Sequence, residues 1–306
     1  MTLERELSEQ MRIIARNTNT NVYSASYWPQ YRYPYRLAKC NKAWSALRDA
    51  SYEFMVDSAY KEGEVTNLQV IEDAAALNPD HIFPKDYPGQ PDRTLQSFIE
   101  FEELMADRDD LNAMAVPIIQ PPHADHLKSN LDFYSNYSKL AVGGLQKYDP
   151  MEQIKIILNI REVVGSSVEL HGFGIGTSFP MIKAMREYPK HDFLNSIDVS
   201  TAERAIRNGQ IPDKTLTQHT FQTPYGEKST TVRAQFSKAL LIMINYLLSD
   251  LVNERTLEEA YYEETGLPDV HEAVEEVDIR SRHELDFGIA EETADASQAT
   301  TLSAFN

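Results

Sequence analysis

The sequence predicts an α/β protein built as a (β/α)₈ barrel, also called a TIM barrel. Short β-rich runs alternate with amphipathic segments, such as residues 151–160, whose apolar positions recur at helical spacing. The runs follow one another at intervals of about 25–35 residues, which is the spacing of such a barrel. No Gly-x-Gly-x-x-Gly follows the first run. Its absence favours a barrel over an open doubly wound sheet.

The predicted elements divide the chain into a long folded part and a short tail. The segments with the composition of strands are 21–24, 53–57, 81–84, 114–120, 140–144, 168–172 and 194–198. Because a helical stretch separates each pair, we expect a parallel sheet. The apolar run 239–248 predicts a late buried helix. We expect residues 1–272 to form the barrel with its late helices, and residues 273–306 to form an acidic, mobile extension.

Composition excludes several classes of protein. The chain has 306 residues and a formal net charge of −18, with 42% hydrophobic residues, so it can bury a full core. A single cysteine, Cys40, excludes a disulfide framework and a structural zinc site made of several thiolates. There is no apolar leader and no stretch resembling a membrane span. We therefore expect a cytoplasmic protein, with no metal, no cofactor and no membrane partner; its oligomeric state stays open.

Polar residues stand where several of the predicted strands end. Asp57 ends the second run, Asp86 follows the third, Gln120 ends the fourth and Asp198 ends the seventh. In a (β/α)₈ barrel the carboxyl ends of the strands form the rim that carries catalytic groups. One Asp in such a place is more often a helix N-cap. Three carboxylates in register, beside glycine-rich loops, favour a site for a polar planar ring.

These residues resemble a known family in their order and spacing. The segment 198–209, an Asp followed by Arg-x-x-Arg-Asn-Gly, resembles the nucleophile segment of the tRNA-guanine transglycosylases. The Gly-Gly-Leu at 143–145 is similar to the family's base-binding loop, and 171–176 is similar to the glycine-rich turn that follows it. The residues around Asp57, Asp86 and Gln120 match upstream motifs of the family in the same order.

The resemblance implies roles for individual residues. Asp198 would be the nucleophile that holds the sugar at C1′ while guanine leaves. Asp57, with a raised pKa, would carry the proton to and from the purine. The base would be bound by the remaining residues of these motifs, which are Asp86, Gln120, Gly143, Gly144, Leu145 and Gly172. Two displacements at one carbon would retain the sugar configuration, and the target base must leave its stack to reach the pocket.

Departures from the family pattern favour DNA over tRNA as the expected substrate. Residues 59–61 replace a Gly-Gly-Phe, residues 200–202 replace a Pro-Thr-Arg, and Cys40 alone cannot form the family's zinc site. The chain is therefore more similar to the zinc-lacking relatives of viruses and DNA-modification clusters. We expect a pentosyltransferase that exchanges guanine in DNA for a 7-deazaguanine base, in a haloarchaeon or in the host cytoplasm of its virus. The alternatives are a tRNA-guanine transglycosylase of the archaeosine or queuosine type, and a catalytically silent paralogue that binds nucleic acid.

An acidic chain that binds a polyanion needs a local positive surface. Residues 32–48 contain five basic residues and no acid, with aromatic residues interleaved. We expect Arg32 and Arg36 to contact phosphates, with Arg204 and Arg207 of the nucleophile segment as further contacts. A structural loop is the alternative for the aromatic segment.

Overall fold

The centre of the protein is a single parallel sheet. The computed structural model describes residues 18–25, 32–43, 45–59, 65–200, 210–212, 218–220 and 230–249. Nine short strands pair in the order β5-β4-β3-β2-β1-β9-β8-β7-β6, and every pairing is parallel. The strands are β1 (Asn21–Ser24), β2 (Tyr35–Lys39), β3 (Glu53–Asp57), β4 (His81–Ile82), β5 (Met114–Ala115), β6 (Ile118–Ile119), β7 (Lys139–Val142), β8 (Glu169–Gly172) and β9 (Ser196–Val199).

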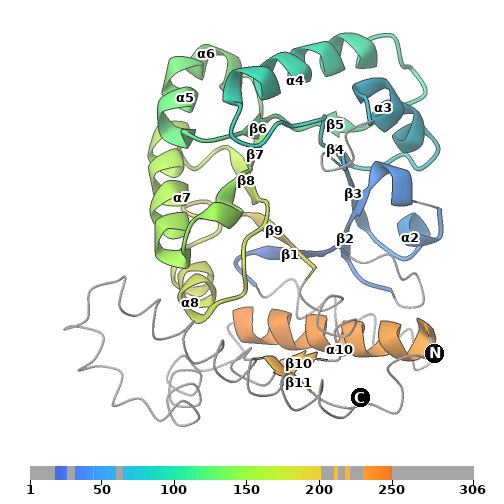
Figure 1. The fold of residues 1–306 in the computed structure, drawn as a ribbon, viewed down its shortest axis with the longest axis vertical. Coiled ribbons are helices and arrows are strands. Elements are labelled where there is room, and N and C mark those ends of the chain that lie inside the picture. The colour runs from blue at the N-terminus through green and yellow to red at the C-terminus, as the bar shows by residue number, and fades with distance from the viewer. Residues whose placement is uncertain are drawn as a thin grey trace, which may run out of the picture.

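The sheet is strongly curled, as in TIM-like α/β proteins (Figure 1). Its two edge strands, β5 and β6, are consecutive in the chain and are separated only by Val116 and Pro117. The Val116 N–H donates to the carbonyl of Ile82, the last residue of β4, and the Pro117 carbonyl accepts from the Ala141 N–H on β7, both at 2.9 Å. The strand ladder is interrupted at this point, where Pro117 has no N–H to donate.

Helices pack against the outside of the curled sheet (Figure 1). They are α2 (Ser45–Asp49), α3 (Asn67–Ala75), α4 (Pro91–Met105), α5 (His123–Ser129), α6 (Leu131–Tyr134), α7 (Pro150–Val164), α8 (Phe179–Glu187) and α10 (Thr230–Leu248). Two short 3₁₀ turns, η1 (Cys40–Lys42) and η2 (Leu145–Lys147), follow β2 and β7, and β10 (Gln210–Pro212) pairs antiparallel with β11 (Gln218–Thr220).

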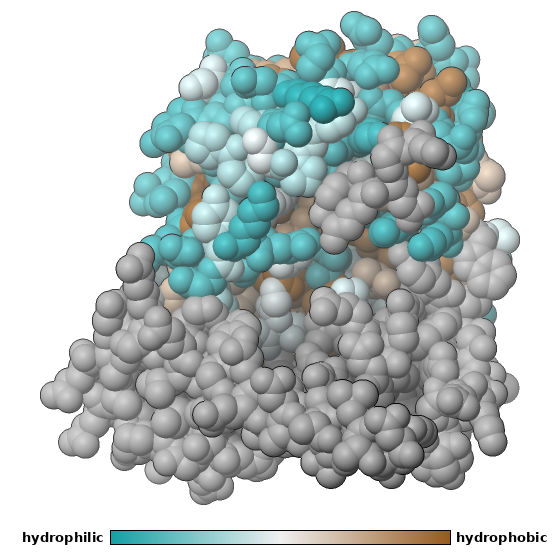
Figure 2. Space-filling model, viewed as in Figure 1, coloured by the Kyte–Doolittle hydropathy of each residue, from teal (hydrophilic) through white to brown (hydrophobic). Residues whose placement is uncertain are grey.

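Local chemistry explains where two long helices of the sheet's outer layer, α4 and α7, begin. Proline occupies the first turn of α4 and of α7, where a missing N–H costs nothing. Asp149 caps α7, because its Oδ1 accepts from the N–H groups of Met151 and Glu152 at 2.9 Å each. On the face seen in Figure 2, the described helices expose mainly hydrophilic residues. Within the described ranges, no helix is long and apolar enough to span a bilayer.

Strand alternation separates the core into an interior and an outer layer. Tyr23, Leu37, Met55, Phe83 and Ala141 form one buried cluster inside the curl of the sheet. The residues between them on each strand belong to two clusters packed beneath the helices. Since residues i and i+2 share a face of a strand, the residues two positions before and after each interior residue also face inward. On β3 these are a glutamate at the start and Asp57 at the end.

The structure confirms the α/β class and the parallel sheet expected from the sequence. Each of the segments predicted as strands contains a strand, and the apolar run 239–248 lies within α10. Strand β2 was not expected, because its sequence Tyr-Arg-Leu-Ala-Lys includes two cations among five residues. The expected acidic extension, 273–306, lies outside the described residues.

Candidate active site at the rim of the sheet

The polar residues singled out in the sequence lie at one end of the sheet. Because the strands are parallel, their carboxyl ends share one rim. Asp57 is the last residue of β3, Asp198 lies in the last half of β9, and Gln120 directly follows β6. Asp86 follows β4, in the loop that leads to α4, and Gly143 directly follows β7. The structure thus brings together residues that are far apart in the sequence.

Asp86 and Gln120 are joined directly. The Gln120 Nε2 donates to Asp86 Oδ2 at 2.7 Å, and both side chains are buried. The Gly89 N–H donates to Gln120 Oε1 at 3.4 Å, which defines the orientation of the amide. A carboxylate and an amide therefore present a fixed hydrogen-bonding edge at the rim.

The two glycines after β7 are required by close packing against this edge. A Cβ at Gly143 would lie 2.5 Å from Gln120 Nε2. Gly144 has φ +72°, and its Cβ would lie 2.8 Å from Cδ of Pro121. Either side chain would push the Gln120 loop away from its position. The Gly-Gly pair is therefore a structural requirement of the Asp86–Gln120 contact.

Part of the backbone of the Gly-Gly-Leu loop is already used within the fold. His123 Nε2 lies 2.7 Å from the Gly143 carbonyl, and the Leu145 carbonyl accepts from Gln153 Nε2 at 3.0 Å. The Leu145 side chain is fully buried in the core beneath the helices. The sequence interpretation expected the whole loop to bind the base. The structure leaves two contributions for the loop, which are its shape and the backbone around Gly144.

The glycine-rich turn after β8 holds Asp198. The Gly174 N–H donates to Asp198 Oδ1 at 3.2 Å. Gly174 has φ +66°, and its Cβ would lie 2.4 Å from Cγ of Gln146, so the turn packs tightly on η2. Gly172 is also confined, since its Cβ would lie 2.7 Å from Ile175. The turn therefore orients the Asp198 carboxylate. Gly172 contributes by allowing the close packing of Ile175 against the strand end.

The charge of Asp57 influences the ionisation of Asp86 and of Asp198. Burial first, and then the nearby charge of Asp57, raise the pKa of Asp86 to about 7, although the hydrogen bonds of Ser58 and Gln120 lower it. Burial also raises the pKa of Asp198 to about 7; the Gly174 N–H opposes this rise and the charge of Asp57 adds to it. Since the charge of Asp57 acts on both Asp86 and Asp198, the three carboxyl groups form one electrostatic cluster. The sequence interpretation expected a raised pKa at Asp57; the structure shows raised pKa values at Asp86 and Asp198, which the sequence interpretation did not expect.

Aromatic rings form the interior beside these carboxylates. Phe83 and Phe173 contact each other edge to face, with ring centroids 4.7 Å apart, and His171 lies within 5.4 Å of both rings. His171 Nδ1 lies 2.8 Å from Ser196 Oγ, and burial holds the pKa of His171 well below its ordinary value, so the ring is neutral. An uncharged aromatic surface under an edge of hydrogen-bonding groups suits a planar heterocycle.

The expected basic surface at 32–36 is corrected by the structure. Arg36 lies in β2 and is fully buried. Arg32 is exposed but precedes β2, so it lies toward the end of the sheet opposite the rim. The missed strand explains both placements. Lys39, the last residue of β2, pairs in register with Asp57, so a cation of this segment does reach the rim. Arg204 and Arg207 lie outside the described residues.

The His-x-x-His spacing at 123–126 does not correspond to a shared site. His123 contacts the Gly143 carbonyl, while His126 Nε2 lies 3.2 Å from the hydroxyl of Tyr134. In the part of the chain that the structure describes, no group of three or more His, Cys, Asp or Glu side chains could hold a metal ion.

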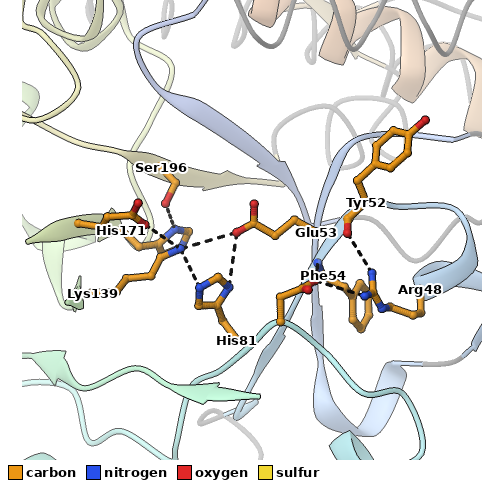
Figure 3. Close-up of polar contacts among 10 residues, drawn as sticks. Arg48, Tyr52, Glu53, Phe54, His81, Lys139, His171 and Ser196 are labelled. Atoms are coloured by element: carbon orange, nitrogen blue, oxygen red, sulfur yellow. Dashed lines mark hydrogen bonds and ion pairs between the residues drawn. The ribbon is translucent and has the colours of Figure 1, made fainter. Parts of the chain in front are cut away.

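A second polar cluster, absent from the sequence interpretation, lies at the opposite end of the sheet (Figure 3). Lys139 Nζ lies 3.7 Å from Glu53, 3.4 Å from Glu169 and 3.2 Å from His81 Nε2. These residues line a cavity of about 430 Å³. Each of these residues is the first residue of a strand. An inward-facing polar residue at the start of several strands is the sequence feature that could have predicted the cluster. In barrels of this kind, residues at the end where the strands begin contribute to stability, and residues at the end where the strands finish carry out catalysis. We therefore assign the chemistry to the rim.

Comparison with known proteins finds no family model that matches this sequence and no curated protein that matches it. The functional proposal below therefore depends on the rim itself.

Proposed function

We propose that this protein is a transglycosylase that exchanges guanine in DNA for a 7-deazaguanine base, on a (β/α)₈ scaffold in the cytoplasm. The observation that carries the proposal is the convergence of Asp57, Asp86 and Asp198 at one rim, with Asp86 bonded to Gln120. A fold has no structural need for three interacting carboxyl groups here, since burying charges costs several kcal/mol.

The Asp86–Gln120 edge is suited to guanine. Guanine presents an N1–H and an amino group on one edge, and an ionised Asp86 can accept hydrogen bonds from both. The Gln120 Nε2 donates one of its two N–H groups to Asp86, and the second can donate to the neighbouring O6. Phe83 and Phe173 supply aromatic surface for the ring. Leaving such donors unpaired in a buried site would cost about 1–3 kcal/mol each, so a base without them is disfavoured.

The remaining two carboxyl groups account for the chemistry. The Asp198 carboxylate attacks C1′ of the deoxyribose, and the C1′–N9 bond breaks with its electron pair passing to guanine. Asp57 gives a proton to the leaving guanine. The incoming 7-deazaguanine returns a proton to Asp57 and attacks C1′, which releases Asp198 with the original sugar configuration.

The pKa of Asp86 and that of Asp198 are both about 7, so each of these carboxyl groups is partly ionised at neutral pH, as the base acceptor and the nucleophile require. At neutral pH the cluster holds part of its protons, so it contains both ionised and protonated carboxyl groups. A carboxylate with a raised pKa is also a stronger base, because its charge is less well stabilised by its surroundings. The same cluster therefore contains a nucleophile and a proton donor at physiological pH.

Base exchange tests the proposal directly. The purified protein is incubated with single-stranded DNA or with tRNA, each carrying labelled guanine, and with cyano, aminomethyl or amidino 7-deazaguanines. Release of label and mass spectrometry of the nucleosides report exchange. The proposal predicts incorporation into DNA that is lost in Asp198→Ala and kept in Asp107→Asn, an exposed carboxylate after α4.

The same experiment separates the alternatives. Incorporation into tRNA alone would replace DNA by tRNA as the substrate, because the site must then accept a 2′-hydroxyl. No exchange with any of the bases on either polymer would contradict the proposal and favour a catalytically silent nucleic-acid-binding protein.

A further inference from the structure

We propose that Arg93 and Lys147 bind the phosphates that flank the target nucleotide, which makes the loops carrying Asp86 and Gly144 the DNA-binding surface. This inference rests on the proposed function, and it replaces the buried Arg36 with cations that the structure places at the rim. A chain with a net charge of −18 repels DNA at long range, so binding requires local cations.

Lys147 lies directly beside the loop that holds the base-recognition edge. It ends η2, which follows the Gly143–Gly144 pair. Its Nζ is 3.9 Å from the position that a Cβ on Gly89 would occupy. The Gly89 N–H in turn donates to Gln120. A base held by Gln120 therefore has its sugar and phosphates at the exposed side of these loops, where the Lys147 ammonium is found.

Arg93 lies at the far end of the same loop, in the first turn of α4. Its guanidinium carbon lies 3.8 Å from the centroid of the Tyr87 ring, and its Nη1 contacts Gln90 Oε1 at 3.4 Å. Stacking restricts the guanidinium while its edge keeps N–H donors for a phosphate. A cation that is already oriented loses less conformational entropy when it binds.

The acids closest in sequence to Arg93 and Lys147 make their contacts elsewhere, and the two cations form no ion pair with a described carboxylate. Asp92 lies 3.5 Å from His126, and Asp149 caps α7. Among the described residues, no carboxylate forms an ion pair with Arg93 or Lys147. Other cations do have such partners in the described ranges, namely Arg48 with Asp80, Arg108 with Asp110, Lys139 with Glu53 and Glu169, and Lys183 with Glu187.

Salt-dependent DNA binding tests this surface without requiring catalysis. The Kd for a fluorescein-labelled, guanine-containing single-stranded oligonucleotide is measured by anisotropy at 50–200 mM KCl. The variants are Arg93→Ala/Lys147→Ala and a matched control, Arg108→Ala/Lys190→Ala, which also removes one arginine and one lysine. The control residues precede β5 and β9, at the end of the sheet away from the rim. Circular dichroism verifies that each variant is folded.

Removing two single-strand phosphate contacts should lower the slope of log Kd against log salt by about 1.4. The loss of affinity between 50 and 200 mM KCl then becomes about sevenfold smaller than in the parent. The control should keep the parent slope. Equal slopes in the rim variant and the control, or a parent that does not bind DNA, would overturn the inference. Binding that depends on the two cations in a protein that exchanges no base would support the surface and refute the proposed function.

Discussion

Replacing Asp86 by Asn should stabilise the protein, and the gain should depend on pH. Burial raises the pKa of Asp86 from 3.8 to about 7. A shift of about three pKa units corresponds to a cost of about 4 kcal/mol for keeping this group ionised in the folded state. Asn has nearly the same shape, and its Oδ1 still accepts the hydrogen bond from Gln120. The variant therefore loses the charge and keeps the contact.

The sign of the pH dependence follows from the direction of the shift. Because the folded pKa of Asp86 is raised, the folded protein binds the proton more tightly than the unfolded chain. The cost is absent near pH 3, where both states are protonated. It grows as pH rises from about 4 to 7, and it is complete above pH 7. We expect the variant to match the parent at pH 3–4 and to exceed its free energy of unfolding by about 4 kcal/mol at pH 8.

Urea unfolding followed by circular dichroism at pH 4, 6 and 8 measures this difference. Asp107→Asn serves as the matched control, because Asp107 is an exposed carboxylate in the turn after α4. The control should change stability by less than about 0.5 kcal/mol at every pH. A gain in Asp86→Asn that is the same at pH 4 and pH 8, or a loss at pH 8, would refute the reasoning about the buried carboxyl group.

Three further predictions concern catalysis and the two ends of the sheet. Asp198 must be ionised to attack, and its pKa is about 7. The rate of exchange should therefore fall about tenfold for each pH unit below 6 in a pH–rate profile. A flat profile down to pH 5 would contradict this. Gly143→Ala should displace Gln120 and raise the KM for the incoming base about tenfold, the equivalent of one lost hydrogen bond, while an unchanged KM would argue against Gln120 in base binding. Lys139→Met should leave two partly exposed glutamates without their buried cation and lower the free energy of unfolding by about 1–3 kcal/mol in urea titrations, whereas a change below about 0.5 kcal/mol would show that the cluster contributes little.

Sequence patterns predicted the strands whose composition is apolar, and they failed where a strand is polar. The segment Glu53–Asp57 has three apolar residues in its centre and was expected as a strand. The segment Tyr35–Lys39 carries Arg36, whose burial depends on residues far away in the sequence. Tertiary packing determined the outcome there, against the local preference. Without β2, the sequence could not reveal that Arg32 lies toward the end of the sheet opposite the rim.

For the candidate site, the sequence predicted positions but not interactions. Strand ends identified Asp57, Asp86 and Asp198, because all parallel strands end at one rim. The direct bond between Asp86 and Gln120 joins residues 34 positions apart and is visible only in the structure. Which carboxyl group has the raised pKa depends on burial and on the distance between charges, and neither is encoded in local spacing.

The central claim is that Asp198 forms a covalent bond with the sugar. Incubating the protein with guanine-containing single-stranded DNA, without an incoming base, should trap a complex that survives denaturing electrophoresis. Its intact mass should equal that of the protein plus the DNA minus one guanine, and peptide mapping should locate the bond at Asp198. Asp198→Ala should form no such complex. A complex of the same mass in Asp198→Ala, or base exchange that continues undiminished in that variant, would contradict the assignment.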